Sequence, residues 1–470
     1  MRKTKIICTI GPSCESEQMI TKLVKAGMNV ARINFSHGTN IEHKTAIEII
    51  REVSKKLSIP VAILADLAGP KIRTGEFKDG IISLKKNTHF TITTQKVEGN
   101  QNIVSTTYSG LCKDVKKGDI LLLSDGLIKL QVMQVKGKDV ICAVIEGGSL
   151  RSNAGINLPD IDIRASSFTA KDRKDLLFAM KMDIDYVATS FVRKASDVMS
   201  VKKAAKNIPV IAKIEKKEAL DNLDLIIDAA DGIMVARGDL GVEIQPEMVP
   251  MIQKTIIAKA KAKGKLVITA TQMLESMVEH SRPTRAEASD VANAILDGTD
   301  AVMLSEETAA GKYPVEATQM MENISKNVEE SKIYKDKFLH FDPFIEQNFS
   351  QLIANAASHI SSQLNLKGII VFTQTGGTGR YVSSYRPAVP IYAVTPDEKV
   401  WRQLSLIWGV MPIKTSIIQN TDELVQRVDK ILINEKIAHD GDNVAIIFSS
   451  PIYKKRPANL LKLHNVGDSD

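Results

Sequence analysis

Hydrophobic residues in the first part of the chain follow two alternating periods. Short runs rich in β-branched residues predict strands over residues 5–10, 29–35 and 61–66. Between these runs, apolar residues recur at helical spacing, which predicts amphipathic helices near residues 16–26 and 42–56. Strands that alternate with helices in this way are typical of βα units and of parallel sheets.

The alternation stops after Gly69 and Pro70. From there to about residue 163, the chain shows strand-like segments rich in Ile, Val and Thr and no long helical pattern. Two stretches that contain proline, residues 69–71 and 157–160, bracket this region. We therefore expect an inserted β domain on two adjacent connections that act as a hinge.

The βα alternation resumes behind the insert with a helical pattern near residues 170–181. Five further strand patterns, each followed by a helical one, cover residues 185–191, 209–215, 231–237, 265–270 and 300–305, and a last helix is expected near 314–331. Three strands before the insert and five after it make the eight that a (β/α)8 barrel requires. The predicted fold class is α/β: a TIM barrel with a β-barrel lid domain inserted after strand 3.

A second alternating series follows an acidic and aromatic linker near residues 336–346. Its strand patterns cover residues 368–373, 389–394, 410–414 and 443–448. This series predicts a separate, open α/β domain at the C-terminal end. The expected domains are the barrel over 1–69 and 165–340, the inserted lid over 70–164, and the α/β domain over 341–470.

Composition narrows the function classes. Of the 470 residues, 44% are hydrophobic and 25% are charged, as in ordinary soluble proteins. The net charge of +7 is dispersed, so nucleic-acid binding is not expected, while anionic small substrates remain open. The four cysteines show no CxxC pair, and no apolar segment is long enough to span a membrane. We expect a cytoplasmic protein with reduced thiols and no membrane partner.

Polar residues at the C-terminal ends of the barrel strands are the candidates for chemistry, because active sites of such barrels lie there. The second strand places Arg32, Asn34 and Ser36 on one face. A half-solvated strand would show the same pattern. Parallel barrel strands, however, are usually buried on both faces and read as apolar runs, so a functional face is the better interpretation.

The fifth strand ends with Lys213 and Glu215 on one face, and the sixth is followed by Gly238 and Asp239. Two carboxylates from adjacent strands suit a Mg²⁺ ion that also takes phosphate oxygens from a substrate. Backbone N–H groups near Gly238, at the start of a short helical turn, are suited to an anion. The competing interpretation is a structural salt bridge between Lys213 and Glu215.

Further polar groups complete the rim. Thr271 follows the seventh strand, Ser305 follows the eighth, Asp66 ends the third, and Arg73 lies just beyond it. Arginine and lysine side chains around a two-carboxylate metal site are typical of phosphoryl transfer, which relies on positioning and charge neutralisation. No Walker A motif is present, so a P-loop enzyme is not expected.

Five segments together resemble the pyruvate kinase family, here in its bacterial form without an extra C-terminal domain. They are residues 33–38 (INFSHG), 69–75 (GPKIRTG), 212–215 (AKIE), 236–241 (ARGDLG) and 270–277 (ATQMLESM). The resemblance extends over essentially the whole chain and includes the interrupted barrel. It implies phosphoryl transfer from phosphoenolpyruvate to ADP, giving pyruvate and ATP, the last step of glycolysis.

The resemblance also implies roles for the rim residues. Glu215 and Asp239 are similar to the family's Mg²⁺ (or Mn²⁺) ligands, and Lys213 to the cation that stabilises the transferring phosphoryl group. Arg32 and Arg73 resemble phosphate clamps. The catalytic set implied is Lys213, Arg32, Thr271 and Ser305; the substrate-binding set is Arg32, Lys213, Gly238, Asp239 and Thr271; and the nucleotide-binding set is Arg73, His37 and Lys171.

Two positions depart from the family pattern. Many members bind K⁺ at positions that correspond to Asn34, Ser36, Asp66 and Leu67, with a Glu where this chain has Lys71, and the K⁺-independent members carry Lys there. A tethered ammonium can supply the charge of the ion, so we expect that K⁺ is not required; Leu67 and Ala68 point the same way. The other departure is Glu306, which adds a carboxylate beside Ser305 in the region that resembles the family's proton-delivery site.

The C-terminal domain carries hydroxyls and glycines directly after a strand. Thr373, Thr375 and Thr378 resemble the family's effector loop, which implies a phosphorylated effector, and a strand-to-helix turn with a vestigial site is the alternative. The resemblance further implies a homotetramer.

Two other functions remain open from the residues. One is another metal-dependent barrel enzyme that acts on phosphoenolpyruvate or an oxo-acid, against which the lid and Arg73 argue. The other is a catalytically silent sensor of sugar phosphates, against which the complete rim of charged residues argues.

Overall fold

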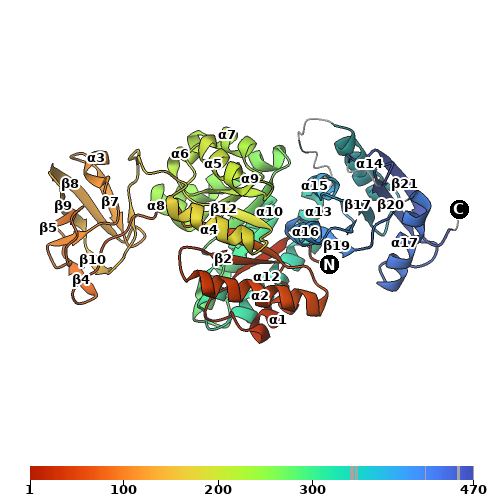
Figure 1. The fold of residues 1–470 in the computed structure, drawn as a ribbon, viewed down its shortest axis with the longest axis horizontal. Coiled ribbons are helices and arrows are strands. Elements are labelled where there is room, and N and C mark those ends of the chain that lie inside the picture. The colour runs from red at the N-terminus through yellow and green to blue at the C-terminus, as the bar shows by residue number, and fades with distance from the viewer. Residues whose placement is uncertain (339–342, 344–347, 419, 453–455, 469–470) are drawn as a thin grey trace.

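The structure, a computed structural model, describes residues 1–338, 343, 348–418, 420–452 and 456–468. A barrel surrounded by helices lies in the middle of the molecule, a β domain on one side of it and an α/β domain on the other (Figure 1). The boundary expected between residues 340 and 341 lies outside the described residues.

The barrel is closed by eight parallel strands in the order β1-β16-β15-β14-β13-β12-β3-β2. These strands are β1 (Lys5–Thr9), β2 (Val30–Asn34), β3 (Ala62–Asp66), β12 (Tyr186–Thr189), β13 (Val210–Ile214), β14 (Gly232–Ala236), β15 (Leu266–Ala270) and β16 (Ala301–Leu304). The predicted interrupted barrel is confirmed, and every predicted strand is present within two residues of its expected ends.

Helices cover the outside of the barrel. They are α1 (Glu17–Ala26), α2 (Asn40–Leu57), α4 (Ala170–Lys181), α5 (Ala195–Ala205), α6 (Lys217–Asp221), α7 (Leu223–Ala229), α8 (Arg237–Glu243), α9 (Val249–Ala262), α10 (Arg285–Asp297), α11 (Glu306–Ala309), α12 (Pro314–Glu330) and α13 (Lys332–Phe338), with 3-10 turns η1 (Pro246–Met248) and η2 (Glu275–Val278). Capping boxes fix several starts: Thr39 with Glu42 begins α2, and Thr284 with Glu287 begins α10.

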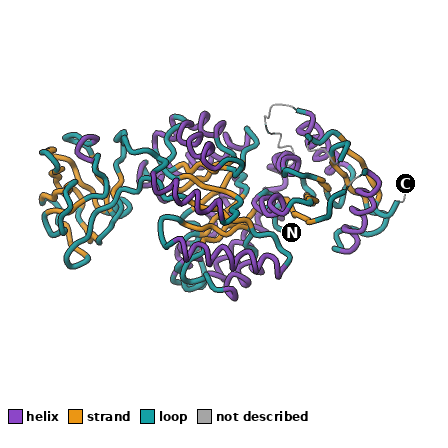
Figure 2. Tube along the Cα trace, viewed as in Figure 1, coloured by secondary structure: helices purple, strands orange, loops and turns teal. Residues whose placement is uncertain are grey.

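The inserted domain consists of strands and loops with one short helix (Figure 2). One sheet pairs β4 (Ile81–Leu84) with β10 (Gly148–Arg151); the other has the order β11 (Ile156–Asn157), β7 (Ile120–Leu123), β8 (Ile128–Lys136), β9 (Asp139–Glu146), β5 (His89–Thr93) and β6 (Ile103–Ser105), and the helix is α3 (Leu111–Asp114). The two connections to the barrel run side by side, because Arg73 forms a β-bridge with Gly155 and the Ile156 N–H donates to the Ile72 carbonyl at 2.9 Å.

The C-terminal domain is an open sheet in the order β19-β18-β17-β20-β21, covered by helices. Its elements are β17 (Ile369–Phe372), β18 (Ile391–Thr395), β19 (Val410–Lys414), β20 (Asn443–Phe448), β21 (Leu460–Asn465), α14 (Phe349–Gln363), α15 (Gly377–Ser384), α16 (Glu398–Gln403), η3 (Leu404–Leu406) and α17 (Thr421–Asn434). The four predicted strands are parallel neighbours. The antiparallel edge strand β21 was not predicted from the sequence. Only His464 is buried in it, so the strand has no apolar face that a hydrophobic pattern could indicate.

The C-terminal domain packs against the N-terminal ends of the barrel strands. Asp300, directly before β16, pairs with Arg386 at 2.7 Å and with Lys261 at 2.9 Å, and all three side chains are buried. Beside β12, Asp185 pairs with Arg402 at 3.0 Å. The docking surface is therefore at the end of the barrel opposite to its expected active site. Within the described residues, no helix combines the length and apolar character needed to cross a bilayer.

Asp300 tests whether this buried ion cluster holds the two domains together. Asp300→Asn leaves the Lys261 and Arg386 cations without their shared carboxylate, and breaking a buried pair typically costs about 3–5 kcal/mol. We expect a clearly lower thermal unfolding midpoint by calorimetry. Asp224→Asn is the matched control, because its pair with Lys259 is exposed and should contribute little. Equal midpoints for the two variants would contradict this role of Asp300.

Candidate active site

A polar pocket of about 470 Å³ opens at the C-terminal ends of the barrel strands. It is lined by Arg32, Asn34, Ser36, Ala68, Lys71, Ser190, Phe191, Lys213, Glu215, Met234, Ala236, Asp239, Thr271 and Met303. Residues from β2, β13, β14 and the segments after β3, β12 and β15 thus meet at one mouth. The polar face predicted for the second strand exists, because Arg32, Asn34 and Ser36 all line the pocket.

A chain of four alternating charges crosses the pocket wall. Arg32 contacts Asp66 through Nε at 2.8 Å and through Nη2 at 2.7 Å. Lys213 Nζ lies 3.3 Å from Asp66 Oδ1 and 2.9 Å from Glu215 Oε1. All four residues are at most 9% exposed. Two cations are therefore held beside the pocket by carboxylates that prevent their mutual repulsion.

These ion pairs set the protonation states. Burial alone would lower the pKa of Lys213, but Asp66 and Glu215 raise it above its ordinary value. Burial would raise the pKa of Asp66, yet Lys213 and Arg32 hold it below its ordinary value. Lys213 is therefore an ammonium at neutral pH, and Asp66 is a carboxylate.

Glu215 and Asp239 fit a hard divalent cation. Burial raises the pKa of Glu215, Lys213 opposes this shift, and the nearby Asp239 adds to it, so the two carboxylates lie close enough to share one cation. Among the described residues, no group of three or more His, Cys, Asp or Glu side chains is arranged to hold a metal. Two carboxylates with substrate oxygens form the kind of shell that Mg²⁺ takes at phosphates.

The segment after β15 turns sharply at the pocket. Thr271 and Gln272 have φ of 67° and 52°, a left-handed conformation that is unfavourable for these residues. Arg237 holds the turn, because its Nη2 donates to the carbonyls of Thr271 at 2.8 Å and Gln272 at 2.9 Å, while its Nη1 pairs with Asp290 at 2.6 Å. The Gly238 N–H, expected to face an anion, donates instead to Thr271 Oγ1 at 2.8 Å.

Three cationic or titratable groups gather at the lid side of the mouth. Lys71 lines the pocket and is exposed. Burial, followed by the charges of Lys71, Arg73 and Arg32, lowers the pKa of His37, so these side chains lie within electrostatic reach of one another. Neither His37 nor Arg73 lines the pocket itself. His37 is held neutral, and the positive potential here favours an anionic ligand.

The remaining predicted site residues lie around this centre. Lys171 Nζ donates to the Phe35 carbonyl and pairs with Asp175, both at 2.7 Å. The Ser305 hydroxyl is buried, does not line the pocket and has no hydrogen-bond partner among the described residues. Glu306 is exposed on α11, whereas its neighbour Glu307 is buried and accepts the Ser305 N–H at 2.7 Å.

Leu67 and the effector loop also have defined surroundings. Leu67 is buried, and its carbonyl accepts the Ser190 hydroxyl at 2.8 Å. In the loop before α15, the buried Thr373 hydroxyl accepts the Gly376 N–H at 2.9 Å and Thr375 is exposed, while Thr378 lies in the first turn of α15 and is half-buried.

Sequence reasoning missed three groups that shape the pocket. Ser190 accepts from Lys213 Nζ at 2.8 Å, and the Phe191 N–H donates to Glu215 Oε2 at 2.8 Å. Thr9 Oγ1 accepts from Arg32 at 2.9 Å. Ser190 at the end of the fourth barrel strand and Thr9 at the end of β1 were available signals, since they occupy the same level as the polar residues recognised on other strands. A backbone N–H leaves no such signal.

The comparisons with known proteins agree with one another. The family model described as "Pyruvate kinase, barrel domain" matches residues 1–318, and "Pyruvate kinase, alpha/beta domain" matches residues 351–464. The pyruvate kinase of Staphylococcus saprophyticus is 46% identical over 475 aligned positions, covering 100% of this chain and 81% of that protein. The pyruvate kinase of Staphylococcus aureus is also 46% identical, with the same coverage.

A solved structure leads to the same family. The crystal structure of a pyruvate kinase from Cryptosporidium parvum superimposes with a TM-score of 0.92 at 37% identity, covering 99% of this chain and 96% of that one. Both family models match, the relatives named above are 46% identical over the full chain, and the structural match covers 99% of it. All of these findings lead to the same family. The chain therefore belongs to the pyruvate kinase family, a family of phosphotransferases.

Proposed function

We propose that the barrel-mouth pocket transfers the phosphoryl group of phosphoenolpyruvate to ADP, giving pyruvate and ATP. The observation that carries this proposal is the buried, protonated Lys213 between Asp66 and Glu215, with Arg32 and Asp239 around the same pocket. Phosphoryl transfer needs fixed positive charge where the three phosphoryl oxygens gather negative charge. Lys213 and Arg32 supply that charge without a rearrangement of the protein.

Glu215 and Asp239 are the residues that would hold Mg²⁺ or Mn²⁺, and members of the family generally use Mg²⁺. The ion supplies Lewis-acid stabilisation of phosphate charge when it is bound. Glu215 is kept in place by the Phe191 N–H and by Lys213, so its carboxylate has one fixed orientation at the pocket.

The substrate carboxylate is assigned to the turn between β14 and α8. The Gly238 N–H donates to Thr271 Oγ1 at 2.8 Å, and the Thr271 hydroxyl donates to the Ala270 carbonyl at 2.6 Å, so rotation of the Thr271 side chain would free both donors for a carboxylate oxygen. The enol carbon must then receive a proton, which we assign to the side of Thr271 and Ser305. The buried, unpartnered Ser305 hydroxyl supports this assignment. Glu306 lies on the exposed face of α11 and acts there only through its charge.

The nucleotide is assigned to the lid side of the mouth. Arg73 lies on the connection to the lid, and His37 and Lys171 lie on the barrel side. Movement of the lid about its two paired connections would bring Arg73 toward the phosphates of ADP. The domain limits 1–69 with 165–340, 70–164 and 341–470 belong to this proposal, as do a homotetramer, cytoplasmic location and a phosphorylated effector at Thr373, Thr375 and Thr378.

K⁺ is not required in this proposal. Asn34, Ser36, Asp66 and Leu67 form the region in which related enzymes bind the monovalent cation, and of these Asn34 and Ser36 line the pocket together with Lys71. The Lys71 ammonium provides a positive charge next to the substrate phosphate without an exchangeable ion.

Lys213→Met tests the phosphoryl-transfer role. Removing one preorganised electrostatic group at a transition state typically costs about 100-fold or more in kcat. We expect at least that loss in a coupled assay with phosphoenolpyruvate, ADP and Mg²⁺, with pyruvate and ATP both measured. Lys312→Met, at an exposed pair with Glu279, is the matched control. Undiminished formation of both products in the Lys213 variant would refute the assignment.

Lys71→Glu tests the cation proposal. In tetramethylammonium buffer, the unmodified protein should have nearly the same rate with and without added K⁺. The variant places a carboxylate beside the substrate phosphate, so its rate should be low until K⁺ is added. Lys71→Gln separates loss of the ammonium from gain of the carboxylate. Strong K⁺ activation of the unmodified protein would contradict the proposal.

Arg73→Met separates the kinase from a barrel enzyme that acts on an oxo-acid without a nucleotide. If Arg73 contacts the nucleotide, the KM for ADP should rise about tenfold or more, as for loss of a hydrogen bond to a charged group, while the KM for phosphoenolpyruvate changes much less. Arg151→Met, on the exposed edge of the lid strand β10, is the control. An unchanged KM for ADP would remove Arg73 from the nucleotide site.

A further inference from the structure

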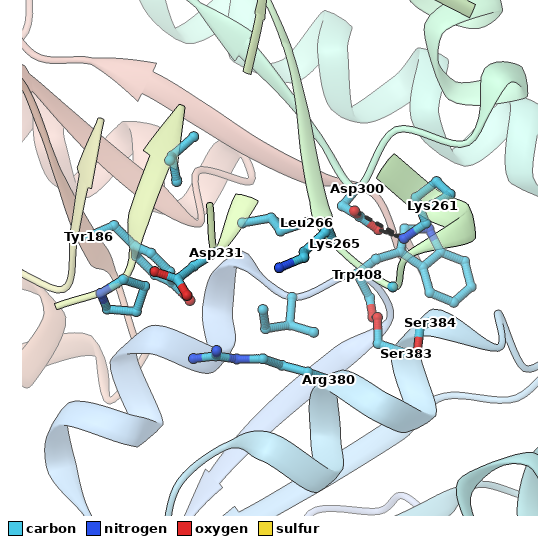
Figure 3. A pocket seen from close by; sticks show the side chains of 14 residues that line it. Tyr186, Asp231, Lys261, Lys265, Leu266, Asp300, Arg380, Ser383, Ser384 and Trp408 are labelled. Atoms are coloured by element: carbon cyan, nitrogen blue, oxygen red, sulfur yellow. Dashed lines mark hydrogen bonds and ion pairs between the residues drawn. The ribbon is translucent and has the colours of Figure 1, made fainter. Parts of the chain in front are cut away.

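A second cavity lies at the opposite end of the barrel, between the strands and the C-terminal domain (Figure 3). It comprises about 490 Å³, including space open to solvent. The barrel contributes Asp231, Ile211 and Lys265, and the C-terminal domain contributes Arg380, Ser384 and Trp408. Neither the barrel-mouth residues nor Thr373, Thr375 and Thr378 line it, so it is separate from both sites discussed above.

The carboxylates of this cavity are already neutralised. Asp300 pairs with Lys261 at 2.9 Å and with Arg386 at 2.7 Å. Asp231 pairs with Lys202 at 2.9 Å and also accepts the Val210 N–H at 2.8 Å. Asp300 is therefore fully engaged, whereas Asp231 also lies within electrostatic reach of Lys265.

Two cations face the cavity without forming an ion pair with any described residue. The Arg380 guanidinium forms no hydrogen bond or ion pair with a described residue, and its Nε is buried without a partner. Lys265 Nζ donates to the carbonyls of Ala230 at 2.8 Å and Asp228 at 3.2 Å. Arg380 extends from α15 and Lys265 from the start of β15, and both point into the same space (Figure 3). A buried guanidinium donor without a partner is costly unless a ligand or water occupies the space before it.

The rest of the wall is mostly apolar and aromatic, with Ser383 and Ser384 as its other polar side chains. Tyr186, Ile407 and Trp408 are buried there, and Leu266 is half-buried. Such a wall accepts a flat apolar body, while Arg380 and Lys265 accept about two negative charges, which is the charge of a phosphate monoester near neutral pH.

We propose that this cavity is a binding site for a small phosphate monoester with a planar apolar body, held by Arg380 and Lys265. The site joins α15, the helix that begins at Gly377 within the segment 373–378, to the barrel strand β13, whose Ile211 lines the cavity. Its occupation strengthens the docking of the C-terminal domain on the barrel, because the ligand bridges cations from both.

Phenyl phosphate is a suitable probe, and calorimetric titration of the full-length protein measures its binding without reference to catalysis. Phenol, which has the ring but no charge, should not bind. Arg380→Met and Lys265→Met should each weaken phenyl phosphate binding about tenfold or more, the effect of losing a hydrogen bond to a charged group. Lys414→Met, an exposed lysine of the same domain, and Thr375→Ala, in the loop, should bind as the unmodified protein does.

A crystal soaked with 4-bromophenyl phosphate locates the ligand independently of any variant. The anomalous bromine peak should lie in the cavity near Trp408. The proposal would be overturned if phenyl phosphate did not bind in solution, or if the Arg380 and Lys265 variants bound it as tightly as the unmodified protein. Loss of binding in Thr375→Ala, or a bromine peak only at the loop or the barrel mouth, would also overturn it. None of these outcomes depends on the phosphotransferase activity, so failure here leaves the proposed function untouched.

Discussion

The buried carboxylate of Asp66 is the constraint on which the barrel mouth depends. It lies at the end of β3 and is shared by Arg32 on β2 and Lys213 on β13, so it holds together three strands that do not all pair directly. Without it, two buried cations would repel each other across the pocket, and the cost of desolvation would shift Lys213 toward its neutral form. Asp66 thus fixes two positive charges beside the pocket before any phosphate binds, and it can do this without contacting the substrate.

The barrel uses its two ends differently. At the mouth, the polar residues face a pocket, whereas at the other end Asp300 and Asp185 bind arginines of the C-terminal domain. One strand reaches both ends: Ile211 of β13 lines the cavity under the C-terminal domain, and Lys213, two residues further on, lines the active-site pocket. A closed barrel is a rigid element. Any influence of the C-terminal domain on the mouth would therefore act through its docking on the barrel rather than through bending of a strand.

The sequence predicts the barrel well because each strand is a continuous apolar run, and it predicts the mouth because charged residues such as Lys213 interrupt those runs at one end. Prediction from the sequence fails where backbone atoms or a neighbouring domain supply the contacts of a site residue. The Phe191 N–H that holds Glu215 is a backbone group, so no residue type indicates it. Arg237 belongs to the motif at residues 236–241, but the sequence does not indicate that its side chain holds the Thr271 turn. The edge strand β21 has no apolar face. The cavity at Arg380 depends on two distant segments, 211–266 and 380–408, which no local pattern relates to each other.

The proposed replacement of K⁺ by Lys71 has a simple basis in the charges around the pocket. Arg32, Lys71 and Lys213 carry three positive charges, and Asp66, Glu215 and Asp239 carry three negative ones, so the metal-free site is neutral. A divalent cation then brings it to about +2, which suits a highly charged phosphate substrate. With a carboxylate in place of Lys71, the same count falls by two and the bound metal would only restore neutrality. In the proposed mechanism a further cation would then be needed to hold the substrate, and the ammonium of Lys71, covalently fixed beside the pocket, would take its place.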